Sequence, residues 1–75
     1  MNISDLKKGD TAVVIAVYGD FSVKKRINAF GIRRGTRITV IGYSPFRSAV
    51  CVRCKGFTLA ISTERAKNIR VQYDK

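Results

Sequence analysis

The fold is decided by the stretch from residue 21 to residue 32, which runs Phe21-Ser22-Val23-Lys24-Lys25-Arg26-Ile27-Asn28-Ala29-Phe30-Gly31-Ile32. This stretch predicts a helix over Phe21–Phe30, because Val23, Ile27 and Phe30 recur at i, i+4 and i+7 and form one apolar stripe. The stripe should pack on a core, which leaves the other face of the helix in solvent.

The two ends of this helix carry recognisable signals. Ser22 is the expected N-cap, because its hydroxyl can accept a hydrogen bond from a free backbone N–H of the first turn. Gly31 should end the helix with a positive φ, and Ile32 supplies the apolar contact that accompanies such an end.

Short strand-like runs lie on both sides of the helix. Alternating or β-branched residues predict strands at Thr11–Tyr18, Thr36–Tyr43, Ser48–Cys54, Phe57–Ile61 and Ile69–Tyr73. The pair Lys55-Gly56 predicts a tight hairpin, and Ser62–Asn68 predicts one helical turn with Ser62 as its cap.

Five short strands and one inserted helix are too few for a broad sandwich. We therefore expect a mainly β fold: a small, five-stranded, partly open SH3-like barrel with short helical turns, because closure leaves few exposed strand edges. The 75 residues allow one domain, covering 1–75. Beside the helical stripe and Phe57, the expected core residues are Val13, Ile15, Ile38, Val40, Val50, Val52, Leu59 and Val71.

The charge is high and unevenly distributed. Fifteen Lys and Arg against five Asp and Glu give a formal net charge of +10. No acid lies between Phe21 and Thr63. Such a surface attracts an acidic protein face, nucleic acid or anionic lipid, whereas solubility alone would be served by interspersed charges.

Catalytic chemistry is poorly supported. The chain has no histidine, and its five acids are scattered among turns and ends. The glycine-containing segment 31–35 follows a helix, whereas a phosphate cradle precedes one. We therefore expect a binding protein that is not an enzyme, with no catalytic residues and no cofactor.

The spacing Cys51-Val52-Arg53-Cys54 is the one candidate for metal or redox chemistry. On a strand, residues three apart point to opposite faces, so the two thiols cannot readily share a metal ion or a disulfide. We expect Cys54 in the core, Cys51 on the outer face and no metal site. A metal or redox sensor through these thiols stays an alternative hypothesis.

Residues 25–36, with Lys25-Arg26 at their start and Gly31 and Gly35-Thr36 near their end, resemble the helix-to-strand signature of FeoA proteins. These are small accessory proteins of bacterial ferrous iron transport. The leading Leu6–Asp10 turn and the closing segments 56–61 and 66–71 also resemble the family. In place of its usual Pro-x-Gly-Asp-Pro turn, the chain has residues 45–48, Pro-Phe-Arg-Ser.

The resemblance implies an SH3-like barrel that acts as an adaptor for the membrane transporter FeoB, at its cytoplasmic GTP-binding region. It implies a cytoplasmic protein that is peripheral to the inner face of the cell membrane through that partner, and it does not imply that this chain binds iron. The N-terminus lacks a secretory pattern, which agrees with that location. A stand-alone basic barrel that binds nucleic acid is the alternative.

The outer face of the predicted helix is the expected docking surface. It is basic, and arginine pairs well with carboxylates. Phe21 or Phe46 is expected to add an apolar anchor beside this surface. The predicted partner-binding residues are Lys24, Lys25, Arg26, Arg33, Arg34, Phe21 and Phe46.

Overall fold

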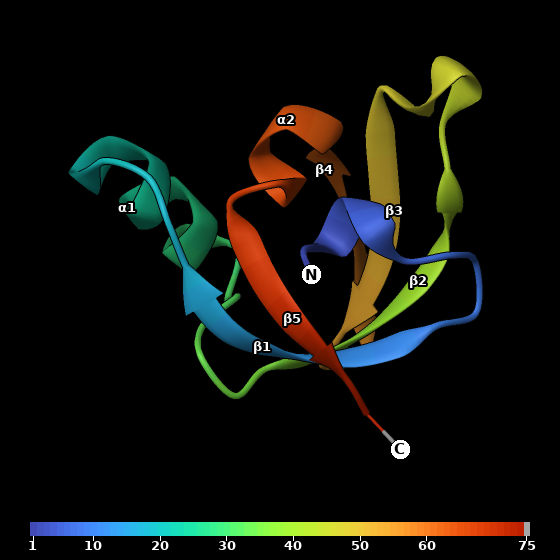
Figure 1. Ribbon diagram of the computed structural model, residues 1–75, viewed down its shortest axis with the longest axis horizontal. Helices are drawn as coiled ribbons and strands as arrows, with labels where there is room; N and C mark the ends of the chain where they lie inside the picture. Colours follow the sequence, from blue (N-terminus) through green and yellow to red (C-terminus); the bar gives the residue numbers. More distant parts are fainter. Residues whose placement is uncertain (75) are drawn as a thin grey trace.

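A computed structural model describes residues 1–74. The strands form one five-stranded antiparallel sheet, in the order β4-β3-β2-β1-β5 (Figure 1). The strands are β1 (Thr11–Val17), β2 (Arg37–Tyr43), β3 (Ala49–Cys54), β4 (Phe57–Ser62) and β5 (Ile69–Tyr73). The helices are α1 (Phe21–Ala29) and α2 (Thr63–Ala66), with 3-10 turns η1 (Ile3–Asp5) and η2 (Pro45–Arg47). The predicted mainly β architecture with one helix inserted after the first strand is confirmed.

Two irregularities help the sheet to bend into a partial barrel. The pairing of β1 with β5 shifts register between Val14 and Ala16, and that of β2 with β3 shifts between Val40 and Gly42. An extra residue in one strand increases the local twist and bends the strand. The hairpin of β3 and β4 has no such shift, and its tight turn at Lys55 and Gly56 has positive φ at both residues.

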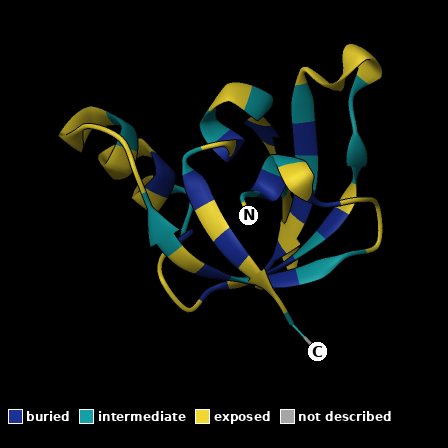
Figure 2. Cartoon of the chain, in the orientation of Figure 1, coloured by how far each residue is buried: buried dark blue, intermediate teal, exposed yellow. Residues whose placement is uncertain are grey.

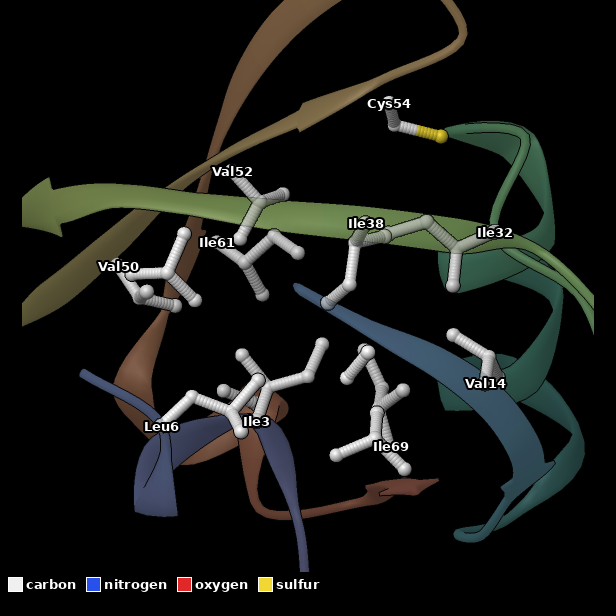
Figure 3. Close-up of a cluster of buried hydrophobic side chains, with 14 of the residues drawn as sticks. Ile3, Leu6, Val14, Ile32, Ile38, Val50, Val52, Cys54, Ile61 and Ile69 are labelled. Atoms are coloured by element: carbon white, nitrogen blue, oxygen red, sulfur yellow. The ribbon is translucent and has the colours of Figure 1, made fainter. Parts of the chain in front are cut away.

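One apolar core fills the inside of the bent sheet. Figure 3 shows side chains from the sheet meeting Ile3 and Leu6 of the N-terminal segment and Ile32 of the chain after α1. Along β3, Val50, Val52 and Cys54 are buried, as alternation predicts. The buried members are Ile3, Leu6, Ala12, Val14, Ile27, Ile32, Ile38, Val40, Val50, Val52, Cys54, Ile61, Ala66, Ile69 and Val71.

The inward face of β1 differs from the prediction. Ala12 and Val14 are fully buried, whereas Val13 is half-buried and Ile15 is 37% exposed. Every residue from Ala12 to Val17 is apolar, so alternation along this run could not identify the inner face. The pairing decides it, because Ala12 lies opposite the buried Ile38.

Phe57 is the second departure, since it was expected in the core and is 47% exposed. It pairs with Cys54 directly beside the hairpin turn. A residue at this end of the sheet has fewer neighbours to cover it, so the aromatic ring keeps contact with water. Leu59, two residues further along β4, is half-buried against the core.

The apolar stripe of α1 lies where the sequence predicts it, although the cap differs. Ile27 is fully buried, and Val23 and Phe30 pack against the core from its edge. The N-cap is Asp20 and not Ser22: its Oδ1 atom accepts a hydrogen bond of 3.0 Å from the backbone N–H of Val23. An aspartate at this position caps the helix and also complements the helix dipole.

The helix is held to the barrel chiefly through Ile27, so this side chain gives a stability test. Truncation by Ile27→Ala should lower the free energy of unfolding by about 2–5 kcal/mol through lost burial and a cavity. The matched change Lys25→Ala, on the exposed face of the same helix, should stay within about 0.5 kcal/mol. Urea denaturation followed by circular dichroism measures both, and equal stabilities would contradict this placement of the helix.

Gly31 ends α1 with a φ of 85°, as predicted. A Cβ added there would meet no atom within 4 Å, so a substitution tests the backbone alone. Gly31→Ala should cost roughly 1–2 kcal/mol of stability, because an L-residue is strained in the left-handed region. Gly42→Ala is the control, since Gly42 is equally uncrowded and lacks a positive φ. Equal costs for the two variants in thermal unfolding would refute the argument.

Candidate protein-docking surface

Helix α1 presents a basic face away from the barrel. With about 3.6 residues per turn, Phe21, Lys24 and Lys25 lie on one side, opposite Val23 and Phe30. All three are exposed, and Phe21 is 80% accessible to water. Figure 1 shows α1 at one flank of the barrel, and Figure 2 shows that most of its surface is exposed. The core therefore uses only one face of this helix.

The turn after α1 adds two more cations, and a buried threonine shapes it. Thr36 is only 7% exposed, and its Oγ1 atom accepts a hydrogen bond of 3.0 Å from the backbone N–H of Arg33. The backbone N–H of Thr36 donates back to the Arg33 carbonyl at 3.0 Å. Arg33 and Arg34 are both exposed as a result. The sequence interpretation missed this role of Thr36, although its place directly after Gly35 was a signal.

Six of the predicted site residues lie on α1 and in the turn that follows it. Lys24, Lys25 and Arg26 lie on α1, Arg33 and Arg34 lie in the turn that follows, and Phe21 begins the helix. We call this set the α1 basic surface; its members are Phe21, Lys24 and Lys25 on one side of the helix, Arg26 nearer the side of Val23 and Phe30, and Arg33 and Arg34 in the turn.

Phe46 is not part of this surface. It lies in η2, between β2 and β3, and Figure 1 shows that connection at the flank of the barrel away from α1. The expectation that Phe46 stands beside the basic residues is therefore not met. The strand order explains the separation, because α1 leaves the end of β1 while η2 follows the far end of the neighbouring strand β2.

The cations of the α1 basic surface have no internal counter-charge within residues 1–74. The ion pair found there joins Arg37 to Asp74 at 2.7 Å and involves none of them. Asp20, the acid nearest in sequence, is engaged as the helix cap. Charges of one sign without internal partners attract an opposite surface and speed encounter with it.

Lys67, directly after α2, and Arg70 of β5 add exposed cations near Tyr18, which precedes α1. Arg70 pairs with Ala16 of β1, and a hollow of about 230 Å³ lies between Tyr18, Lys67 and Arg70. Tyr18 is half exposed. Lys67 and Arg70 were missed from the sequence because only the pairing of β1 with β5 brings them close.

The outer side of β1, which sequence patterning placed in the core, lines a second open hollow that shares Met1 and Arg70 with the first. Its volume is about 890 Å³, and Val13, Ile15 and Met1 form apolar parts of its wall. Arg70, Gln72 and Asp74 add polar groups from β5 and its end. The incompletely buried side chains of Val13 and Ile15 on β1 therefore line this hollow.

The two cysteines lie on opposite faces of β3, as the strand geometry predicts. Cys54 is buried in the core, and Cys51 is partly exposed; both are free thiols. In the described part of the chain, no three Cys, Asp or Glu side chains gather closely enough to hold a metal ion. Among residues 1–74 there is also no helix of the length and apolarity that would cross a bilayer.

The different burial of the thiols leads to a labelling prediction. Iodoacetamide should modify Cys51 in the folded protein and Cys54 only after unfolding, because alkylation requires access to the sulfur atom. Cleavage by an arginine-specific protease after Arg53 and Arg65 separates the two cysteines into different peptides, with Cys54 in residues 54–65, so mass spectrometry can assign each label. Equal rates of modification in the folded state would contradict the position of Cys54.

Comparisons with known proteins relate this architecture to iron transport. The profile of the FeoA domain family matches residues 1–73. The chain is 35% identical over 72 residues to an Fe(2+) transport protein A/Fe(2+) transporter FeoB fusion protein of Porphyromonas gingivalis. That match covers 96% of this chain and 8% of the fusion protein, so the chain spans a small part of its relative.

Solved structures of FeoA proteins have the same fold as this chain. The NMR structure of an FeoA-like protein from Clostridium acetobutylicum has a TM-score of 0.90 at 26% identity, covering 97% of this chain and 85% of that one. The FeoA protein from Chlorobium tepidum has a TM-score of 0.88 at 32% identity, with 97% and 70% covered. A manganese-dependent transcriptional repressor matches at 0.91 and 21% identity over 36% of its length, a likeness of fold alone. The predicted SH3-like fold is confirmed.

Proposed function

Because the chain belongs to the FeoA domain family, we propose that it is an adaptor of bacterial ferrous iron uptake that binds the cytoplasmic GTP-binding region of a FeoB-type transporter. The chain acts by binding and not by catalysis. It is cytoplasmic and reaches the inner face of the membrane through this partner. The α1 basic surface is the docking surface.

The observation that carries the proposal is the fusion relative. In that protein, a segment 35% identical to this chain is joined to a FeoB transporter in one polypeptide. A covalent link holds two modules at an effective concentration that can reach millimolar, which favours even a weak contact between them. The fusion therefore supports a functional contact between an FeoA domain and its transporter.

The structure supports the choice of this surface because one side of α1 packs on the core and the other side is exposed to solvent. One face of the helix holds it to the core through Ile27, and the exposed side carries Lys24 and Lys25, which have no ion-pair partner among residues 1–74. Phe21 lies between these lysines and can add apolar contact to the charge. Charge complementarity sets encounter and register, while a buried aromatic adds affinity.

Nucleic acid is the alternative partner that the net charge of +10 suggests. Proteins that hold single strands combine a basic groove with several stacking aromatics. The α1 basic surface contains one exposed aromatic ring, that of Phe21. This surface is the convex face of a helix and not a groove. These features favour a protein partner.

The proposal predicts that reversing two charges on α1 weakens binding. The variant Lys24→Glu/Lys25→Glu should bind the purified cytoplasmic domain of the transporter at least tenfold more weakly, a loss of about 1.4 kcal/mol. Isothermal titration calorimetry measures the affinity, and raised salt should weaken binding of the parent protein because it screens exposed charges.

The matched control is Lys7→Glu/Lys8→Glu. It changes the net charge equally at two exposed lysines in the turn before β1, outside the α1 basic surface. This control should bind like the parent. If both double variants lose affinity equally, net charge and not the α1 surface is responsible. Binding of the parent to a nucleic acid oligomer more tightly than to the transporter would favour the alternative function.

A further inference from the structure

The connection between β2 and β3 holds an aromatic side chain in an unusual position. Phe46 has a φ of 62°, and its side chain is fully exposed. The next residue, Arg47, also has a positive φ of 54°. Positive φ is uncommon for residues other than glycine, and two in succession mark a strained segment that its surroundings must hold in place.

A hydrogen-bond network holds the base of this connection. The hydroxyl oxygens of Ser44 and Ser48 lie 2.8 Å apart. The backbone N–H of Ala49 donates to Ser44 Oγ at 2.8 Å, and that of Arg47 donates to the Ser44 carbonyl at 2.9 Å. These contacts join the two ends of the connection, so the strained backbone between them is fixed by its frame.

Arg47 ties the same connection to the rest of the protein. Its guanidinium carbon lies 3.8 Å from the centre of the Tyr43 ring, and its Nη2 atom donates to the Ser4 carbonyl at 3.1 Å. The Arg47 carbonyl accepts a hydrogen bond from the Thr63 hydroxyl. Tyr43 in turn donates from its hydroxyl to the Leu6 carbonyl at 2.5 Å. Contacts to η1, β2 and α2 therefore leave Phe46 as a projecting ring on a fixed frame.

We infer that Phe46 is a preformed aromatic anchor that inserts into an apolar pocket on the cytoplasmic region of the transporter. The inference rests on the proposed function, because the partner is the same protein. A fully hydrated ring gains free energy only by burial elsewhere, and aromatic residues are enriched among those that dominate binding energy. A frame already fixed before binding reduces the entropy lost on association.

The surroundings of Phe46 favour a protein pocket over a bilayer. In the sequence, Phe46 is flanked by Pro45, by the polar residues Ser44 and Ser48, and by Arg47, whose guanidinium lies over the Tyr43 ring. Interfacial membrane segments combine a broad apolar face with several free cations. A single exposed ring between polar sequence neighbours instead matches a pocket of about its own size.

The positions of the two docking points are compatible with one partner. Figure 1 shows η2 and α1 at opposite flanks, with α2 between them, and the longest dimension of the molecule is 29 Å. An interface of standard size covers about 800 Å² per protein, which is roughly 30 Å across. A single partner would therefore have to extend along the α2 side of the molecule to contact both the α1 basic surface and Phe46.

Salt dependence separates the two contacts in titration calorimetry against the purified cytoplasmic domain of the transporter. Phe46→Ala should weaken binding at least tenfold at both low and high salt, because burial of an apolar ring is not screened by ions. The salt dependence itself should stay that of the parent, whereas Lys24→Glu/Lys25→Glu should reduce it.

A glycine substitution separates the side chain from the backbone. Phe46→Gly relieves the positive φ, so its melting temperature should equal or exceed that of the parent while its affinity falls at least tenfold. Lys55→Gly is the matched control, since Lys55 also has a positive φ, of 51°, in an exposed turn. It should keep its melting temperature and bind within twofold of the parent.

Four results would overturn the inference. Parent-like affinity of both Phe46 variants, together with weak binding by Lys24→Glu/Lys25→Glu, would leave the proposed function intact and remove the anchor. An equal loss in Lys55→Gly would show that a backbone change, and not the ring, weakens binding. Binding of the parent to vesicles of phosphatidylglycerol that is lost in Phe46→Ala would assign the ring to a membrane. A parent that does not bind the transporter would remove both proposals.

Discussion

Both backbone hydrogen-bonding groups of Val14 are taken by the turn that returns from α1. The Val14 N–H donates to the Thr36 carbonyl at 2.8 Å, and the Gly35 N–H donates to the Val14 carbonyl at 2.7 Å. Val14 is fully buried, so leaving these groups without partners would cost free energy. The chain that leaves β1 and passes through α1 must therefore return to Val14 at Gly35 and Thr36. We call this return the closure, and the rest of the structure depends on it.

The closure fixes where the helix can lie and what it can present. A helix of nine residues is marginal in isolation, so α1 depends on tertiary contacts for its stability. The contact is made by its apolar stripe, centred on Ile27. Once that face packs on the barrel, Lys24 and Lys25 point to solvent and form no ion pair with any residue from 1 to 74. The same closure places Arg33 and Arg34 in a turn shaped by Thr36, next to the helix in sequence and exposed with it.

Sequence patterns predicted those parts of the fold that local chemistry determines. The end of α1 at Gly31 and the hairpin at Gly56 follow from the conformational freedom of glycine. The inward face of β3 follows from alternation, because only one side of that strand is wholly apolar. The inner face of β1 could not be predicted in this way: Val13 and Val14 are equally apolar, and the pairing with β2 and β5 decides between them.

In the candidate site too, local features could be predicted from the sequence and features set by strand order could not. Exposure of Lys24 and Lys25 follows from helical periodicity, a local property. The distance between Phe46 and these lysines depends on strand order, which no local pattern contains. The helix cap is a second example of this limit. Both aspartate and serine can cap a helix, and the chain geometry before α1 makes Asp20 the cap where Ser22 was predicted.

The unpaired cations of α1 also have a thermodynamic meaning for the free protein. Folding fixes like charges on one segment with no ion-pair partner among residues 1–74, so their mutual repulsion opposes the native state. An acidic partner would remove that repulsion when it binds, and part of the binding energy would then appear as added stability of the fold. The surface that makes the isolated domain less stable is thus the one through which a complex would stabilise it.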